Sequence, residues 1–380
     1  MKPILIFIYA LIIFLNISCQ HNAAIKFSVD NNSNYDTIIS GYNFDLNIKH
    51  NGGNDLIFYD SCFYDIYDFC GDSTLKVINL STNKLTILDY HEPSCGQVYT
   101  SLKKDGIYTI SNKNVISKYN WGEKNNTKVL DLMDIDQFKN SGLTAWWHKV
   151  WGNQHVNIPE NILYFRLEKD LNSDSGKYSL IDSLYPIFCK VNIKTNEIGF
   201  YGYRPNIGPG LMHNSYELYF EDSIFVTYSY NEKIERINTI SGKTDVFFVK
   251  SSFDTIPIKT FEFNEATYTL QKNIKHCLET ANYGPLYYNP FNKNYYRIFH
   301  PYLQERDFLG ELNTDFDKEC VLMIMDNDLK LKEEVVLPVK YSNLMTLYPV
   351  REGVDFYMAP KHINKIPGKT EFTYLRYKHH

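Results

Sequence analysis

Three short stretches of this chain follow one pattern: INLSTNK (78–84), VNIKTNE (191–197) and INTISGK (237–243). Each reads as an apolar residue, an asparagine, a short polar turn and a charged residue that opens a second strand. Asparagine, serine and glycine favour tight turns between strands. Each stretch therefore predicts a β-hairpin, and the repetition indicates that one supersecondary unit recurs along the chain.

The same hairpin pattern recurs at Asn114–Leu132 and Cys320–Pro338, and a further strand of this type is predicted at Thr370–Tyr377. Strand centres fall near positions 78, 116, 191, 237, 324 and 373. The shorter spacings between them are typical of propeller blades, each a four-stranded antiparallel sheet of about 40–50 residues. The longer spacings contain insertions, and one of these, Glu265–Glu279, is the only predicted helix.

The sequence thus predicts an all-β fold, a β-propeller of about six four-stranded blades, with seven possible, and one short helical insertion. Strands in the early segments AAIKFSV (23–29) and YNFDLNIKH (42–50) are expected to join the last blade. That pairing would close the ring and cover exposed sheet edges. Aromatic residues make up 16% of the chain and include 31 tyrosines, which suits packing between sheets.

The N-terminus resembles a bacterial lipoprotein signal. Lys2 precedes an apolar run, Ile4–Leu15, that is too short to span a bilayer, and Cys19 follows Ser18 in a lipobox-like position. We expect residues 1–18 to be a signal peptide, 19–24 a lipidated linker and 25–380 a single domain. Lipidation of Cys19 would anchor the protein in a membrane. By analogy with Gram-negative lipoproteins, the outer membrane is favoured, with a periplasm-facing rather than surface-exposed domain. A plain secreted protein and an uncleaved membrane anchor are the alternatives.

Charge and cysteine content narrow the classes of partner. The formal net charge is −5 with charges of both signs interspersed, which disfavours nucleic acid as a partner. Six cysteines follow Cys19 without a CxxC spacing. Cys62, Cys70 and Cys95 are close enough in sequence for one local disulfide, and the alternative is that most of the six are buried small hydrophobic residues. We expect no cofactor and a monomer.

The segment YGPLYYNPFNKNYYRIFHP, at 283–301, carries a resemblance to a known family. Tyr283-Gly284-Pro285 followed by Tyr295-Tyr296-Arg297 is similar to lipoproteins of Bacteroidetes that form a domain of unknown function, related to six-bladed TolB-like propellers. The resemblance implies a propeller in the cell envelope and implies no activity. From the residues, Asn289–Lys293 is predicted to be the turn of a hairpin. Arg297 could face a central channel or stack on a tyrosine.

The stretch AWWHKVWGNQH, at 145–155, is the densest aromatic cluster of the chain. Trp146, Trp147 and Trp151 could form a platform for sugars or a partner, with His148 beside them. The alternative is that this loop buries its indoles as a small satellite core. His148 and His155 have no acidic or cysteine partner nearby, so no metal site is predicted.

A second candidate contact lies in the link GYRPNIGPGLMHNSYE (202–217). Links between blades line one mouth of a propeller channel, so Arg204 and His213 are candidate ligand contacts, together with Tyr283 and Arg297. An ordinary connection between blades is the alternative.

No nucleophile elbow, P-loop or dinucleotide fingerprint occurs in the sequence. The leading hypothesis is a non-catalytic module that binds an envelope protein, a peptide or a glycan. The alternative is a glycan-active hydrolase or lyase that uses carboxylates at the channel mouth, because such acids can come from separate blades. A purely structural envelope component is a third hypothesis.

Overall fold

A computed structural model describes 25 strands and the turns between many of them. The described residues are 35–42, 55–59, 62–68, 74–79, 84–89, 99–111, 114–120, 126–145, 153–169, 185–203, 215–229, 231–255, 275–276, 278–313, 317–340, 347–351, 353–358 and 370–378. Within these ranges, no helix is long and apolar enough to cross a membrane.

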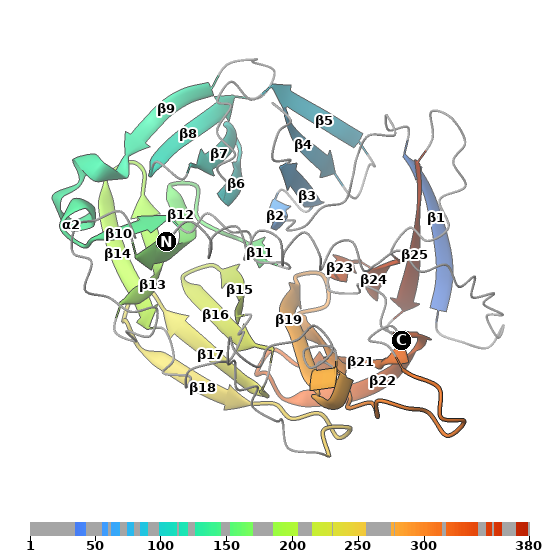
Figure 1. Cartoon of the computed structure of the whole chain (residues 1–380). Coiled ribbons are helices and arrows are strands. Elements are labelled where there is room, and N and C mark those ends of the chain that lie inside the picture. Colours follow the sequence, from blue (N-terminus) through green and yellow to red (C-terminus); the bar gives the residue numbers. More distant parts are fainter. Residues whose placement is uncertain are drawn as a thin grey trace, which may run out of the picture.

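The predicted all-β fold is confirmed. The strands form four four-stranded sheets and one nine-stranded sheet, and together they contain six four-stranded antiparallel groups, which Figure 1 shows around a common centre. Group one consists of β2 (Asp55–Tyr59), β3 (Cys62–Asp68), β4 (Thr74–Asn79) and β5 (Lys84–Asp89). Group two consists of β6 (Tyr99–Lys103), β7 (Gly106–Ile110), β8 (Val115–Asn120) and β9 (Asn126–Asp131). Group three consists of β10 (Leu143–Ala145), β12 (Ile162–Lys169), β13 (Pro186–Asn192) and β14 (Glu197–Tyr203).

The other three groups are built in the same way. Group four consists of β15 (Ser215–Phe220), β16 (Ser223–Tyr228), β17 (Lys233–Asn238) and β18 (Thr244–Phe248). Group five consists of β19 (Asn282–Asn289), β20 (Asn294–His300), β21 (Glu319–Met325) and β22 (Leu331–Lys340). Group six, the last, consists of β23 (Leu347–Val350), β24 (Gly353–Met358), β25 (Thr370–Lys378) and β1 (Tyr35–Tyr42).

The repeated hairpin pattern occupies one place in this architecture. All three opening stretches join the third and fourth strands of a group: β4 to β5, β13 to β14 and β17 to β18. The further predicted hairpins, β8–β9 and β21–β22, hold the same place. The sequence repeat is therefore the outer hairpin of groups one to five.

The turn chemistry explains why the pattern repeats. Asn192 Oδ1 accepts hydrogen bonds from the backbone N–H of Lys194 and Thr195, and Asn238 Oδ1 accepts the equivalent pair from Ile240 and Ser241. An asparagine side chain that satisfies the next backbone donors holds a tight turn.

The sixth position of the pattern closes the same turns. Asn196 and Gly242 both adopt a left-handed conformation, with φ of 60° and 70°. Asparagine and glycine tolerate this conformation best. In both turns the backbone N–H of this residue donates to the carbonyl oxygen of the first asparagine at 2.8 Å.

An N-terminal strand completes the last group, as expected, but it comes from another segment than the two predicted. β1 pairs antiparallel with β25 along its whole length, from Tyr35 opposite Tyr377 to Tyr42 opposite Thr370. Residues 23–29, and all of 42–50 except Tyr42, lie outside the described residues. The pairing covers the outer edge of β25 with a strand from the opposite end of the chain.

One strand departs from the repeat. β11 (Asn153–Val156) runs parallel to both β2 and β15 and joins groups one and four into the nine-stranded sheet. In Figure 1 it crosses the middle of the ring between these two strands. The innermost strands of two groups on different sides of the ring are thus hydrogen-bonded through one short insertion.

The core lies between neighbouring groups, where sheets face each other. One cluster joins groups four and five, a second groups two and three, and a third groups three and four. Tyrosines contribute to all three, and the rings of Tyr164 and Tyr219 stack at 5.5 Å between centroids. The expectation that tyrosine serves packing between sheets is confirmed for these boundaries.

Helix is sparse in the described part. A one-turn 3₁₀ helix, Leu132–Asp134, and α2 (Asp136–Lys139) follow β9 and were not predicted from the sequence. They bury Leu132 and Phe138 against the boundary between groups two and three. Of the predicted helix 265–279, residues 275–276 and 278–279 are helical, and the other positions lie outside the described residues.

Candidate functional site

At the centre of the ring, the side chain of Gln154 joins β11 to β19. Its Nε2 donates to the carbonyl oxygen of Tyr288 at 2.9 Å, and its Oε1 accepts from the N–H of Tyr288 at 2.7 Å. Gln154 is fully buried, and its side-chain amide pairs with the backbone of β19 in group five as a residue of a neighbouring strand would. The neighbouring His155 packs its ring against Tyr219 of β15, with centroids 4.7 Å apart.

A buried acidic residue lies on the innermost strand of group four. Glu217 Oε1 accepts a hydrogen bond from Arg166 Nη1 of group three at 3.0 Å, and the Glu217 side chain is completely buried. Ser215, at the start of the same strand, lies 3.5 Å from the same oxygen. A buried carboxylate needs such partners because desolvation penalises its charge. This ion pair therefore joins two neighbouring groups.

Arg297, a candidate contact from the sequence, is fully buried between groups four and five. Its guanidinium lies over the ring of Tyr283 at 4.6 Å from the centroid. Nε donates to Gly284 O at 2.9 Å, and Nη2 donates to Tyr228 O at 2.8 Å and Asn231 O at 3.3 Å. This is the tyrosine-stacked arrangement that the sequence offered as one of two alternatives.

The electrostatics of this pair follow from burial. Burial lowers the pKa of Arg297 to about 10, so the guanidinium stays charged at neutral pH. Burial also raises the pKa of Tyr283, whose hydroxyl donates to Asp254 Oδ2 at 2.8 Å. The cation thus faces an electron-rich ring whose hydroxyl is bound to a carboxylate, which offsets part of the cost of burying the charge.

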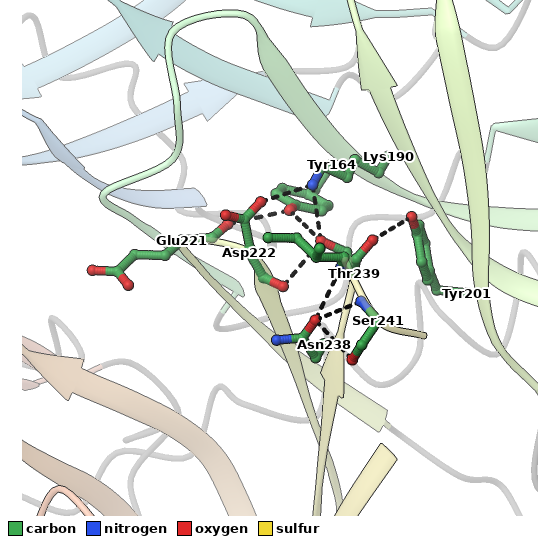
Figure 2. A network of polar contacts seen from close by, with 9 residues as sticks. Tyr164, Lys190, Tyr201, Glu221, Asp222, Asn238, Thr239 and Ser241 are labelled. Carbon is green, nitrogen blue, oxygen red and sulfur yellow. Dashed lines mark hydrogen bonds and ion pairs between the residues drawn. The ribbon is translucent and has the colours of Figure 1, made fainter. Parts of the chain in front are cut away.

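A second polar network crosses the boundary between groups three and four (Figure 2). Lys190 Nζ lies 2.8 Å from Asp222 Oδ1 and donates to Thr239 Oγ1 at 3.0 Å. The Thr239 hydroxyl also contacts the Tyr164 hydroxyl at 3.1 Å, and Tyr201 donates to Thr239 O at 2.7 Å.

Asn238, the second residue of the INTISGK pattern, precedes the residue at the centre of this network. Thr239 donates its hydroxyl to Asp222 O at 2.9 Å, and its backbone N–H donates to the same oxygen at 2.8 Å. The turn that closes the outer hairpin therefore also fastens group four to group three.

Cys320 and His300 form a buried thiol–imidazole pair, with Sγ 3.6 Å from Nδ1. Burial raises the pKa of Cys320 to about 12 and lowers the pKa of His300 to about 3. The thiol is therefore protonated and the imidazole neutral at physiological pH, whereas a nucleophilic cysteine requires a thiolate. Cys320 and Cys189 are both buried free thiols, as one of the two hypotheses for the cysteines predicted.

Most of the candidate residues from the sequence fall outside the described residues. These are Cys19, Trp146, Trp147, His148, Trp151, Arg204 and His213. Tyr283 and Arg297 are described and brought together. The Trp-rich segment leads directly into β11, and the link that contains Arg204 and His213 leads directly into β15.

Sequence reasoning missed Gln154, Glu217 and Arg166. An acidic residue inside the apolar strand SYELYF (215–220) was a detectable signal of a buried ionic contact. In the described ranges, no group of three or more histidine, cysteine, aspartate or glutamate side chains could hold a metal ion.

Comparisons with known proteins identify the family. A crystal structure of a DUF4221 member from Bacteroides vulgatus is similar over 90% of this chain and 98% of its own, with 12% identity and a TM-score of 0.56, which shows a shared fold. A Bacteroides thetaiotaomicron protein of unknown function aligns with 90% of this chain and 76% of its own, at 13% identity and a TM-score of 0.43. A luciferin-regenerating enzyme aligns with 90% of this chain and 95% of its own, at 7% sequence identity and a TM-score of 0.41.

No curated protein matches the chain. Residues 96–335 match the family described as Domain of unknown function (DUF4221), and this match spans more than half of the sequence. The chain belongs to the DUF4221 family.

Proposed function

We propose that this protein is a lipid-anchored, six-bladed β-propeller that serves the cell envelope as a non-catalytic binding module for a protein, peptide or glycan. Each four-stranded group would be one blade, and the pairing of β1 with β25 would close the ring. Lipidation of Cys19 would anchor the domain to the outer membrane, facing the periplasm.

The observation that carries the binding role is the occupied centre. β11 lies between the innermost strands of groups one and four, and Gln154 joins it to a third group. In propellers with an open channel, ligands reach polar side chains in the middle. Here Gln154 is engaged with the protein itself, which favours binding on the loops of one face.

The loops that would form this binding face include two of the candidate segments. Inner strands β2 and β15 run in the same direction, because both are parallel to β11. The link with Arg204 and His213 enters β15 at its N-terminal end, and Trp151 lies two residues before Asn153, the first residue of β11. We propose that these segments contribute contacts on a common face.

The experiment is a pull-down of the tagged, full-length protein from detergent-solubilised envelope, with bound proteins and glycans analysed by mass spectrometry. A stoichiometric protein or an enriched glycan is expected. A variant with Trp146→Ala and Trp147→Ala should lose that ligand with little change in melting temperature. A drop of many degrees would instead place the two indoles in the core.

One observation favours glycan hydrolysis as the second candidate. Glu217 is a buried carboxylate on an innermost strand and is paired with Arg166. It would supply one of the two acids that a glycoside hydrolase uses. Release of reducing sugar from envelope glycans by wild type, abolished in Glu217→Gln, would support this candidate. Equal release by both proteins, or none by either, would contradict it.

A further inference from the structure

Three large apolar side chains are exposed on one turn between β20 and β21. The exposed fraction is 94% for Phe308, 71% for Leu309 and 62% for Leu312. In Figure 1 this segment is part of the orange loop that projects from the sheets at the lower right. Single exposed apolar residues are ordinary on protein surfaces, whereas several on one short turn mark a contact site.

The turn holds its shape through its own hydrogen bonds. Asp307 Oδ1 accepts from the N–H of Leu309 at 2.9 Å and of Glu311 at 2.8 Å. Asp307 N donates to Glu311 O at 2.9 Å, and Gly310, at a left-handed φ of 83°, donates to Asp307 O at 3.1 Å. The apolar side chains make none of these hydrogen bonds, so the turn keeps its shape without them and leaves them exposed to solvent.

The base of the turn is fastened to the body of the protein. Asn313 N donates to Glu305 O at 2.9 Å, and Leu303 N donates to Leu278 O at 3.0 Å. Lys275 Nζ lies 2.8 Å from Glu305 Oε2. A contact residue held on a rigid turn loses less conformational entropy on binding, which favours affinity.

The charges beside the apolar tip are mainly acidic. Glu305, Asp307 and Glu311 flank it in sequence, and Glu305 is paired with Lys275. Arg306, the one basic residue within 305–313, donates to Gly310 O at 2.6 Å. Apolar segments that insert into membranes usually carry lysine or arginine beside them, which anionic lipid attracts. The acidic flanks disfavour a lipid surface and complement a basic rim.

We propose that residues 305–313 are a docking element for a protein partner. Phe308 and Leu309 would enter an apolar pocket on that partner, and basic side chains around the pocket would face Glu311. An aromatic anchor at the centre with charges at the rim is the arrangement that dominates many protein interfaces. The inference rests on the proposed binding function and names the class of partner and the contact.

The test is the envelope pull-down repeated with four proteins: wild type, Phe308→Ser with Leu309→Ser, Glu311→Lys, and Ile240→Ser as the control. Ile240 is 76% exposed on a turn of group four, so its substitution removes a comparable apolar side chain elsewhere. The double variant should lower recovery of the protein partner about ten-fold or more, and the control should leave it unchanged. Glu311→Lys should weaken binding about three-fold and reduce its salt dependence.

A photo-crosslinking residue at position 308 should label the same protein, and one at position 240 should not. Retention of the partner by the double variant would overturn this inference and leave the binding function standing. Recovery of a glycan without protein would also overturn it, and recovery of neither would contradict both proposals.

A lipid surface is the remaining occupant to distinguish. The Cys19→Ala protein should not float with neutral or anionic phospholipid vesicles. Flotation that depends on Phe308 and Leu309 would assign the turn to a membrane and overturn the protein partner.

Discussion

The side-chain amide of Gln154 pairs with both backbone groups of Tyr288, as one strand residue pairs with another. The two residues are 134 positions apart in sequence. Through this contact the inserted strand β11 joins the innermost strands of groups one, four and five. The centre of the ring is therefore a hydrogen-bonded unit rather than a stack of apolar side chains.

Replacing Gln154 with Leu should destabilise the protein by about 2–4 kcal/mol, because the buried N–H and C=O of Tyr288 would both lose their partner. Urea denaturation followed by circular dichroism measures this difference. The matched control is Gln304→Leu, the same change at an exposed position, which should stay within about 0.5 kcal/mol of wild type. Equal effects of the two variants would contradict a central role for the Gln154 amide.

Replacing Arg297 with Met should cost about 2–4 kcal/mol, since three carbonyl oxygens lose a donor and Tyr283 loses its cation. Arg297→Lys should also destabilise, because one ammonium cannot reproduce the planar donor set. The measurement is again the free energy of unfolding. Binding lost at unchanged stability would instead make Arg297 a ligand contact.

The stability of the protein should fall in acid partly through His300. Burial lowers its pKa to about 3, against 6.5 in the unfolded chain. Between these values the unfolded state binds a proton that the folded state does not, so stability rises with pH and is lost as the pH falls from about 6.5.

The His300 effect can be isolated with His300→Gln. The difference in stability between wild type and this variant should change by about 1.4 kcal/mol per pH unit between pH 6 and pH 4. Carboxylates common to both proteins largely cancel in the difference. A difference that stays constant over this range would show that His300 titrates normally in the folded protein.

Thr239→Val should destabilise the boundary between groups three and four by about 1–3 kcal/mol. The hydroxyl it removes binds Lys190, Tyr164 and the carbonyl oxygen of Asp222 (Figure 2), and valine leaves these buried groups with fewer partners. Thr239→Ser keeps the hydroxyl and is the control, expected to lose less. Calorimetric melting of the three proteins compares them, and a valine variant no less stable than wild type would contradict a role for the hydroxyl.

Cys19→Ala should release the protein from the membrane fraction or leave its precursor uncleaved, because no diacylated cysteine can form. Fractionation of cells and metabolic labelling with a fatty acid measure both effects. Cys189→Ala is a control, since this thiol is buried within the domain. Recovery of unchanged, labelled Cys19→Ala protein in the membrane fraction would refute lipidation at this residue.

The outer hairpins were predictable because their information is local. In VNIKTNE and INTISGK, the first asparagine binds backbone groups two and three residues later, and the sixth residue takes the left-handed conformation. These preferences act within five residues, so they are visible in the sequence. Tyr283 and Arg297 were also identified together, because they lie on consecutive strands of one hairpin.

The central contacts were not predictable for the opposite reason. Nothing in NQHV (153–156) distinguishes a strand that joins three groups from one at the edge of a single sheet. The strand that completes the last group in the described part of the chain, β1, begins at Tyr35 and shares only Tyr42 with the two segments expected there. Partner choice among strands depends on which edges remain open once the other sheets have formed.

The all-β class, the repeated hairpins and their turn residues follow from the sequence, because hydrogen bonds between near neighbours and strand propensities act along the chain. The positions of β11 at the centre, of Arg297 against Tyr228 across 69 positions, and of Phe308 and Leu309 at the surface follow only from the assembled fold. Burial and long-range pairing are properties of the assembled sheets, since the same apolar residue can be core in one place and surface in another.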